Sequence, residues 1–326
     1  MPRLDAQALR RARVGAQWLH RPKATATDVV AHLLAVQAQD ISSFPRAITA
    51  RSSTATVDDV AAARDERSIV RAWGPRGTLH LMAARDHAWM TELFAPLWRT
   101  QSLRRLRQEG VPQSEDVLIR VVSAALAGQG PLTKAALGER LASLGVPAAG
   151  QGIVHAVALG ASHGLVVLGP DRGTKPTYVF AADWLPAPAA LTREAALGEL
   201  AGRYLASRGP AGPEDLAAWS GLGLNDARAA FARVSVVEVE ADGRPLWRLA
   251  RGASRAATVE RALLPAYDEY LLSWRDRDLI LDPAHASKVY PGGGILRPVI
   301  VTDGVITGTW APATGALTPF PEAAPP

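Results

Sequence analysis

The sequence predicts a mainly α fold with β strands, built from three similar domains followed by a smaller β-rich one. Three observations support this prediction. One order of elements, helix, helix, helix, strand, turn, strand, recurs along the first 257 residues. After residue 258, strand and turn signals dominate instead. Finally, 326 residues of which 48% are hydrophobic and 21% charged can fill several ordinary globular cores.

The repeated unit is clearest in the middle of the chain. Apolar residues recur at helical spacing after Ser114, a favourable N-cap, and two further helical patterns precede a pair of strand-like runs around a Gly/Pro/Asp turn. The expected helices of this copy are 114–127, 132–145 and 150–163, and its strands lie within 164–180. The next copy has helices at 192–207, 213–222 and 225–234 and strands at 236–240 and 245–249. The first copy has helices at 4–19, 25–38 and 57–66 and strands at 69–73 and 78–82.

This order of elements is the plan of a winged helix, a helix-turn-helix variant with a β-hairpin wing. The alternative is a set of unrelated helical hairpins. We therefore expect three tandem winged-helix domains and a small β-barrel-like domain, with a loose end over 313–326. The expected boundaries are 1–112, 113–188, 189–257 and 258–326.

Composition and charge narrow the class of protein. The chain contains no cysteine, which excludes disulfides and thiolate metal sites and fits a cytoplasmic location. No run of eighteen apolar residues and no signal-peptide pattern occurs, so no membrane partner is expected. The net charge of +5, carried mostly by arginine, favours a polyanionic partner but also fits a GC-rich genome.

Several enzyme classes lack their sequence signatures. The seven histidines show no HExxH-like spacing, and no zinc pattern, phosphate loop or nucleotide fingerprint is present. The glycines at 292–294 precede a strand rather than a helix, which indicates a turn and not a phosphate cradle. No G-x-S-x-G elbow marks a serine nucleophile. We expect neither a metal nor a cofactor.

Three stretches remain as candidates for function. RAWGPRGTLHLM (71–82) combines arginines with an aromatic residue, which suits phosphate contacts and base stacking or, alternatively, an ordinary packed wing. PAYDEYLLSWRDRD (265–278) alternates carboxylates with arginines, a pattern more typical of a salt-bridged structural segment. VQAQD (36–40) places two amides beside a carboxylate, and by itself it is most simply a polar helix end.

In this order and spacing, VQAQD, RAWGPRGTLHLM, LLPAYDEYLLSWRDR and GGGILRPVIVTDGVITGTW resemble the winged-helix bacterial DNA glycosylases of the AlkZ and YcaQ type. The resemblance covers essentially the whole chain. It implies tandem winged helices, a C-terminal β-barrel and a catalytic motif of glutamine, a small or apolar residue, then glutamine or aspartate. Gln37 and Gln39 match the glutamine–glutamine form of the AlkZ-like branch, whereas the YcaQ-like branch has aspartate at the second position.

The resemblance also implies a substrate. The AlkZ-like branch is associated with producers of DNA-alkylating natural products, which it protects by excising bulky N7-alkylpurines and unhooking interstrand crosslinks such as those of azinomycin. Alkylation at N7 gives the base a fixed positive charge, so it can leave neutral without a general acid. A side-chain amide is then sufficient, because it can hold the nucleophilic water as acceptor and donor.

The expected geometry follows from that role. Residues two apart share a face in an extended segment but lie about 200° apart on an α-helix. We therefore expect Gln37 and Gln39 to converge on the water where the helix ends or distorts. Asp40 is the alternative base, or a structural carboxylate that orients the motif.

The expected partner is double-stranded DNA that carries N7-alkylguanine or crosslinks, bound by a monomer in an open cleft. Candidates for phosphate contacts are Arg71, Arg76, Arg172 and Lys175, in that order. Trp73 and His80 complete the candidate DNA-binding set. Two rival classes stay open, a winged-helix transcriptional regulator without enzymatic activity and a protein that sequesters the alkylating agent.

Overall fold

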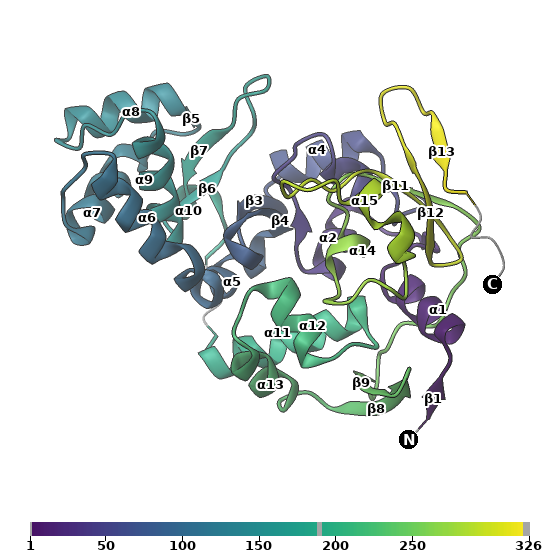
Figure 1. The fold of residues 1–326 in the computed structure, drawn as a ribbon. Coiled ribbons are helices and arrows are strands. Elements are labelled where there is room, and N and C mark those ends of the chain that lie inside the picture. The colour runs from purple at the N-terminus through teal and green to yellow at the C-terminus, as the bar shows by residue number, and fades with distance from the viewer. Residues whose placement is uncertain (1, 188–190, 322–326) are drawn as a thin grey trace. The chain divides into compact units, whose positions relative to one another are not determined.

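The computed structural model describes residues 2–187 and 191–321 and has a mixed α/β fold (Figure 1). The chain divides into two compact units: unit 1 comprises 1–60 and 197–326, and unit 2 comprises 61–196. The first and last segments of the sequence therefore share one unit. None of the helices in the described residues combines the length and the apolar composition that a bilayer crossing requires.

Several helix ends in unit 1 have the residue types that helix termini favour. Helix α1 starts after Asp5, whose carboxylate accepts the Ala8 N–H, and α2 starts with a capping box formed by Thr25 and Asp28. Helix α12 ends at Gly221 in the left-handed region, with φ 80°. The helices that lie wholly in unit 1 are α1 (Ala6–Ala16), α2 (Ala26–Leu33), α3 (Phe44–Thr49), α12 (Pro213–Ser220), α13 (Leu224–Phe231), α14 (Glu269–Leu272), the 3-10 helix η3 (Pro283–His285) and α15 (Ala286–Val289). Helices α4 (Val57–Asp65) and α11 (Arg193–Arg208) contain the two points at which the chain passes between the units.

Two sheets lie in unit 1. In the first, β1 (Arg3–Leu4) pairs parallel with β8 (Val236–Ala241), which pairs antiparallel with β9 (Arg244–Leu249). Asp242 and Gly243 close the β8–β9 hairpin with positive φ at both positions, as a two-residue turn of this kind requires. The second sheet is antiparallel and has the order β10 (Ala262–Leu264), β11 (Val299–Thr302), β12 (Val305–Trp310), β13 (Leu317–Pro319).

The C-terminal strands do not form the barrel-like domain that the sequence suggested. Within residues 191–321, β10 and β13 occupy the two edges of an open sheet. The strands are three to six residues long, and four such strands are fewer than the five of the small OB-type barrels. The prediction of β structure after residue 258 is confirmed, and closure is corrected to an open sheet.

Unit 2 contains a sheet with helices packed against it. Its strands follow the order β4-β3-β6-β7-β5, and β3 pairs antiparallel with both β4 and β6. The strands are β3 (Ile69–Trp73), β4 (Leu79–Ala83), β5 (Leu132–Thr133), β6 (Val166–Leu168) and β7 (Thr177–Phe180). The helices are α5 (His87–Phe94), α6 (Pro96–Gln108), α7 (Glu115–Leu126), α8 (Lys134–Ser143), α9 (Gln151–Ser162) and α10 (Ala181–Trp184), with 3-10 turns η1 (Pro75–Gly77) and η2 (Ala84–Asp86).

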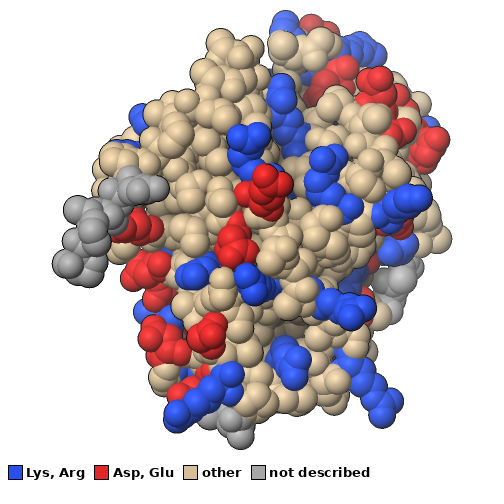
Figure 2. Space-filling view, turned by 90° about the vertical axis from the view of Figure 1, so that its right-hand side faces the viewer, with Lys and Arg blue, Asp and Glu red and all other residues tan. Residues whose placement is uncertain are grey.

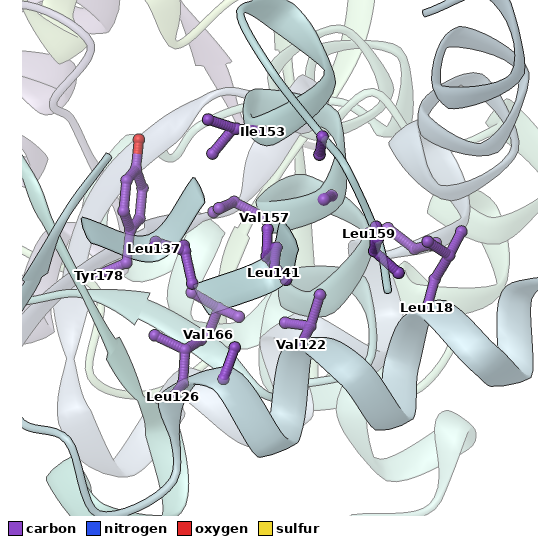
Figure 3. Close-up of a cluster of buried hydrophobic side chains, with 14 of the residues drawn as sticks. Leu118, Val122, Leu126, Leu137, Leu141, Ile153, Val157, Leu159, Val166 and Tyr178 are labelled. Carbon is purple, nitrogen blue, oxygen red and sulfur yellow. The ribbon is translucent and has the colours of Figure 1, made fainter. Parts of the chain in front are cut away.

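The core of unit 2 lies between α7, α8, α9 and the β6–β7 hairpin (Figure 3). Val122 of α7, Leu141 of α8 and Val157 of α9 are each at most 1% exposed and point toward one another. Burial of such aliphatic side chains stabilises a fold by about 1.5–3 kcal/mol each. The helical spacing that predicted these elements is therefore the spacing of the residues that form the core.

The expected helices and strands are confirmed, apart from the end of α2, but the structure adds α3 inside the first copy and α5 and α6 between the first and second copies. All nine expected helices and the six expected strands of the three copies are present within a few residues of their predicted ranges. The division into domains at 112, 188 and 257 stays a prediction. The boundary between 188 and 189 falls outside the described residues, as does part of the expected loose end.

Candidate catalytic site

The chain leaves helical geometry just before the two glutamines. Helix α2 ends at Leu33, five residues before the end of the predicted helix. Leu34 follows with φ 67° and ψ −47°, a conformation that costs a leucine of the order of 1–3 kcal/mol. Both leucines are fully buried, and their burial offsets that cost. VQAQD therefore lies where the helix ends, as we expected because residues two apart point to different sides of a regular helix.

The segment that carries the glutamines starts as a short extended strand and bends at Gln39. Strand β2 (Val36–Gln37) begins the motif, and Val36 and Ala38 are 1% and 0% exposed. Gln37 between them is half-buried, and Gln39 is exposed. An extended chain alternates in this way, but the strand ends at Gln37 and the backbone bends at Gln39 and Asp40. Ala38 is therefore packed inside, whereas Gln37 is partly exposed and Gln39 is exposed, and the convergence of the two amides on one side stays a prediction.

A buried carboxylate from the far end of the sequence holds this segment. The Gln37 backbone N–H donates to Glu269 Oε1 at 2.9 Å. Glu269 Oε2 accepts from Arg208 Nη2 at 2.7 Å and from Trp219 Nε1 at 2.9 Å, and Glu269 is 0% exposed. Sequence reasoning did not single out Glu269, although its stretch, 265–278, was one of the three candidates.

Arg208 also contacts the end of α2. Its Nη1 donates to the Leu33 carbonyl at 2.9 Å, which is one of the carbonyls that a helix end leaves without a helical partner. The guanidinium lies 4.3 Å from the centroid of the Trp219 ring. Burial lowers the pKa of Arg208 from its ordinary value, and the charge of Glu269 opposes this shift. The Glu269 carboxylate thus compensates the charge of the Arg208 guanidinium, which has no access to water.

A second buried pair lies beside the first. Arg51 donates to both carboxylate oxygens of Asp268, at 2.8 and 2.7 Å, and both side chains are 0% exposed. Arg51 also donates to Gln17 Oε1 at 2.8 Å, and Asp268 caps α14 by accepting the Tyr270 N–H. The salt-bridged structural character predicted for 265–278 is therefore confirmed for Asp268 and Glu269.

Asp40 shapes the loop that follows the motif. Its Oδ1 accepts from the Ser42 N–H and from Ser42 Oγ, and its Oδ2 accepts from Ser43 Oγ, all at 2.8 Å. Side chain to backbone contacts of this pattern favour turns. Of the two expected roles of Asp40, these contacts fit the structural carboxylate.

The structure places the predicted DNA contacts of 71–82 mostly inside unit 2. Arg71 on β3 is 5% exposed and forms an ion pair of 3.6 Å with Asp171, and His80 on β4 is 0% exposed with Nδ1 2.9 Å from the Thr78 carbonyl. Trp73 is half-buried against the unit 2 core. Arg76 is half-buried in the turn η1, with φ 57°. The hairpin is thus packed through these side chains.

Arg172 and Lys175 lie together at the tip of the β6–β7 hairpin. The Arg172 N–H donates to the Lys175 carbonyl at 2.8 Å, and Gly173 between them has φ 62°. Both basic side chains are exposed, and the hairpin tip extends past its strands (Figure 1). They are therefore available for contact with a polyanion.

The charge of the rest of the surface is mixed. On the face drawn in Figure 2, Lys and Arg side chains are interspersed with Asp and Glu rather than gathered into one basic area. Among residues 2–187 and 191–321, no group of three His, Asp or Glu side chains could hold a metal ion.

The model of a protein family described as DNA glycosylase AlkZ-like matches residues 30–319. The chain belongs to this family. The matched range includes VQAQD, the buried ion pairs and all three predicted wings. This AlkZ-like protein is therefore a DNA glycosylase, an enzyme that hydrolyses N-glycosyl bonds, and the regulator and drug-sequestering alternatives are set aside.

Two comparisons with individual proteins agree with the family. The AlkZ-like chain is 29% identical, over 93% of its length and 86% of the relative, to an interstrand DNA cross-link repair glycosylase from Streptomyces sahachiroi. It is also similar to the solved structure of the Streptomyces sahachiroi DNA glycosylase AlkZ. The TM-score is 0.81 at 26% identity, and the match covers 99% of this chain and 92% of that one. The mixed α/β fold is thus shared over the whole chain.

Proposed function

We propose that this glycosylase excises bulky N7-alkylpurines from DNA, including the unhooking of interstrand crosslinks, with the nucleophilic water positioned by Gln37 and Gln39. The observation that supports the proposal is the position of VQAQD directly after α2, where a short strand at Val36–Gln37 leads into a bend at Gln39 and the two amides are more exposed than the buried Ala38 between them. The crosslink specificity rests on the likeness to the Streptomyces sahachiroi repair glycosylase.

The two amides suit a substrate that is already activated. An N7-alkylated purine carries a positive charge on the base and leaves neutral, so the enzyme needs no strong acid. Each glutamine offers an acceptor and a donor with which to orient a water against C1′ of the deoxyribose. Positioning of this kind can lower a barrier by about 7–11 kcal/mol in the best cases. Unmodified purines leave too slowly for so weak a catalytic group.

DNA binding is assigned to the hairpins of the repeated units, which we interpret as three tandem winged helices followed by a β-rich domain. Arg172 and Lys175 at the exposed tip of the β6–β7 hairpin are the foremost phosphate contacts, followed by Arg76. Arg71, Trp73 and His80 support the first hairpin from within, because their side chains are largely buried. Asp40 keeps the catalytic loop in shape rather than acting as the base.

The test measures base release from an N7-methylguanine duplex under single-turnover conditions, followed by alkaline cleavage of the abasic sites. Wild-type protein should release the base, and a Gln37→Ala/Gln39→Ala double variant should bind the DNA but release almost none. A circular dichroism spectrum equal to that of the wild type ensures that the double variant is folded. Full activity of that folded variant would exclude the two glutamines.

A duplex with a site-specific N7-linked crosslink extends the test to the bulky substrate. Denaturing electrophoresis should show conversion of the crosslinked species to single strands by the wild type only. Protection of a bacterial host against a DNA-alkylating natural product, by the wild type and not by the double variant, would support a role in self-resistance. Release of methylguanine without unhooking would restrict the function to monoadducts.

A further inference from the structure

One ion pair bridges the turn from α2 into the catalytic segment. At one end, Arg208 Nη1 donates to the Leu33 carbonyl at 2.9 Å, and at the other end the Gln37 N–H donates to Glu269 Oε1 at 2.9 Å. Arg208 Nη2 and Glu269 Oε2 join the two contacts at 2.7 Å. Leu34, Ala35 and Val36 lie between the bridged positions and are at most 1% exposed.

The bridged turn does not follow from local propensity. Leu34 has φ 67°, which an L-residue adopts only when its surroundings hold it there. The two-residue strand that follows is too short to fix its own direction. The acceptor of the Gln37 N–H is Glu269, a residue 232 positions away in the sequence. Tertiary contacts must therefore determine where the segment leaves the helix and which side it presents.

We propose that Glu269 is a positioning residue for the glycosylase reaction, which holds the Gln37 backbone so that Gln37 and Gln39 face the substrate together. The proposal rests on the assignment of the two glutamines in the proposed function. Glu269 is fully buried and touches the backbone of the motif, so it acts on the reaction through Gln37 rather than on the substrate.

The position requires a carboxylate. Three donors converge on Glu269: the Gln37 N–H, Arg208 Nη2 and Trp219 Nε1. An ionised carboxylate only accepts hydrogen bonds and can satisfy all three, whereas an amide turns its own NH₂ toward at least one of them. The isosteric change Glu269→Gln therefore disturbs the Gln37 contact, the Arg208 contact or both.

The neighbouring residue provides a matched control. Asp268 precedes Glu269 and is equally buried, and it forms its own ion pair with Arg51. Its contacts run to Arg51 and to the start of α14. Asp268→Asn thus makes the same chemical change in the adjacent buried pair, and a loss caused by destabilisation alone would affect both variants.

The experiment compares single-turnover rate constants for N7-methylguanine release at saturating enzyme, at a temperature where each variant is folded by circular dichroism. Both variants should unfold at a lower temperature than the wild type. Glu269→Gln should lower the rate constant by about 10²-fold, because a displacement of the order of 1 Å has effects of this size. Asp268→Asn should stay near the wild-type value, and the dissociation constant for DNA should change little in either.

Hydrogen exchange gives a readout that a general loss of stability does not reproduce. In Glu269→Gln the Gln37 amide should exchange faster relative to the α1 amides, and in Asp268→Asn it should keep its relative protection. If Glu269→Gln does not fold, Glu269→Asp replaces it, since it keeps the charge but shortens the reach toward Gln37. The same slow release and selective exchange are then expected.

Three outcomes decide the matter. Slow release and selective exchange in the Glu269 variant alone support the positioning role. A Glu269 variant with the wild-type rate constant, or equal losses in both variants, would overturn it. If the positioning role is overturned in either way, the proposed function still stands provided that the folded Gln37→Ala/Gln39→Ala variant is inactive. An active double variant would instead remove the catalytic assignment on which the positioning role rests.

Discussion

The Arg208 guanidinium and the Glu269 carboxylate form an ion pair of 2.7 Å in which neither side chain is exposed. The two residues are 61 positions apart, and each also contacts the backbone in or just before VQAQD. Water cannot screen the pair, so either charge would be left uncompensated if its partner were removed. The pair therefore couples the stability of unit 1 to the geometry of the site.

Removal of the cation should be costly for stability. Arg208→Met leaves Glu269 charged and buried, and we expect a loss of about 3–5 kcal/mol in the free energy of unfolding. The double change Arg208→Met/Glu269→Met should lose less, because no unpaired charge remains. Urea denaturation of the wild type, the single variant and the double variant measures both losses in the free energy of unfolding. A double variant less stable than Arg208→Met would contradict this explanation.

Substitution of Asp40 separates its two expected roles. Asp40→Asn retains an oxygen that can accept the Ser42 N–H, so a structural residue should leave the rate constant for base release close to the wild-type value. A general base would lose about 10²–10⁴-fold. Asp40→Ala, which removes the loop contacts altogether, should be slower than Asp40→Asn. Single-turnover release at several pH values makes the comparison.

Acidification should destabilise the protein through buried histidines. Burial lowers the pKa of His87 to about 4, below its ordinary 6.5, so the unfolded chain binds more protons between these values. The contribution of His87 is fully present above about pH 6.5 and is lost as the pH falls toward 4. From pH 7 to pH 5 the loss should be about 2 kcal/mol.

Urea denaturation of wild-type protein and His87→Gln across this range tests the prediction. The variant should lose less stability on acidification. His32, whose pKa burial also lowers to about 4, should continue to contribute in both proteins. Parallel curves for the two proteins would show that His87 does not titrate as described.

DNA affinity should depend on the exposed hairpin tip. Arg172→Gln/Lys175→Gln should reduce the salt slope of DNA binding by about 2, since each lost phosphate contact reduces it by about 1. Arg71→Gln is the comparison, because Arg71 is buried against Asp171 and should affect stability rather than the slope. Fluorescence anisotropy over a series of salt concentrations measures both. A larger change for Arg71 would reverse the assignment.

The helices and strands could be predicted because local patterns determine them. Apolar spacing and capping residues located the helices of all three copies, and strand and turn signals located the β8–β9 hairpin and the β structure after residue 258. The hairpin at 71–82 was predicted with two alternatives, phosphate contacts or an ordinary packed wing, and the burial of Arg71 and His80 fits the packed wing. Burial depends on what packs against a strand, which a local pattern does not contain.

The sequence by itself determined the repeated helix and strand plan, the family and the two amides of VQAQD as candidates for catalysis, because these depend on residue identity and spacing. Only the tertiary structure decided that α2 stops at Leu33, that the chain continues as a short strand at Val36–Gln37, and that the Glu269 carboxylate accepts the Gln37 N–H. The contact from Gln37 to Glu269 spans 232 positions. A left-handed leucine and a buried ion pair are stable only when packing supplies their compensation, and that packing exists only in the folded chain.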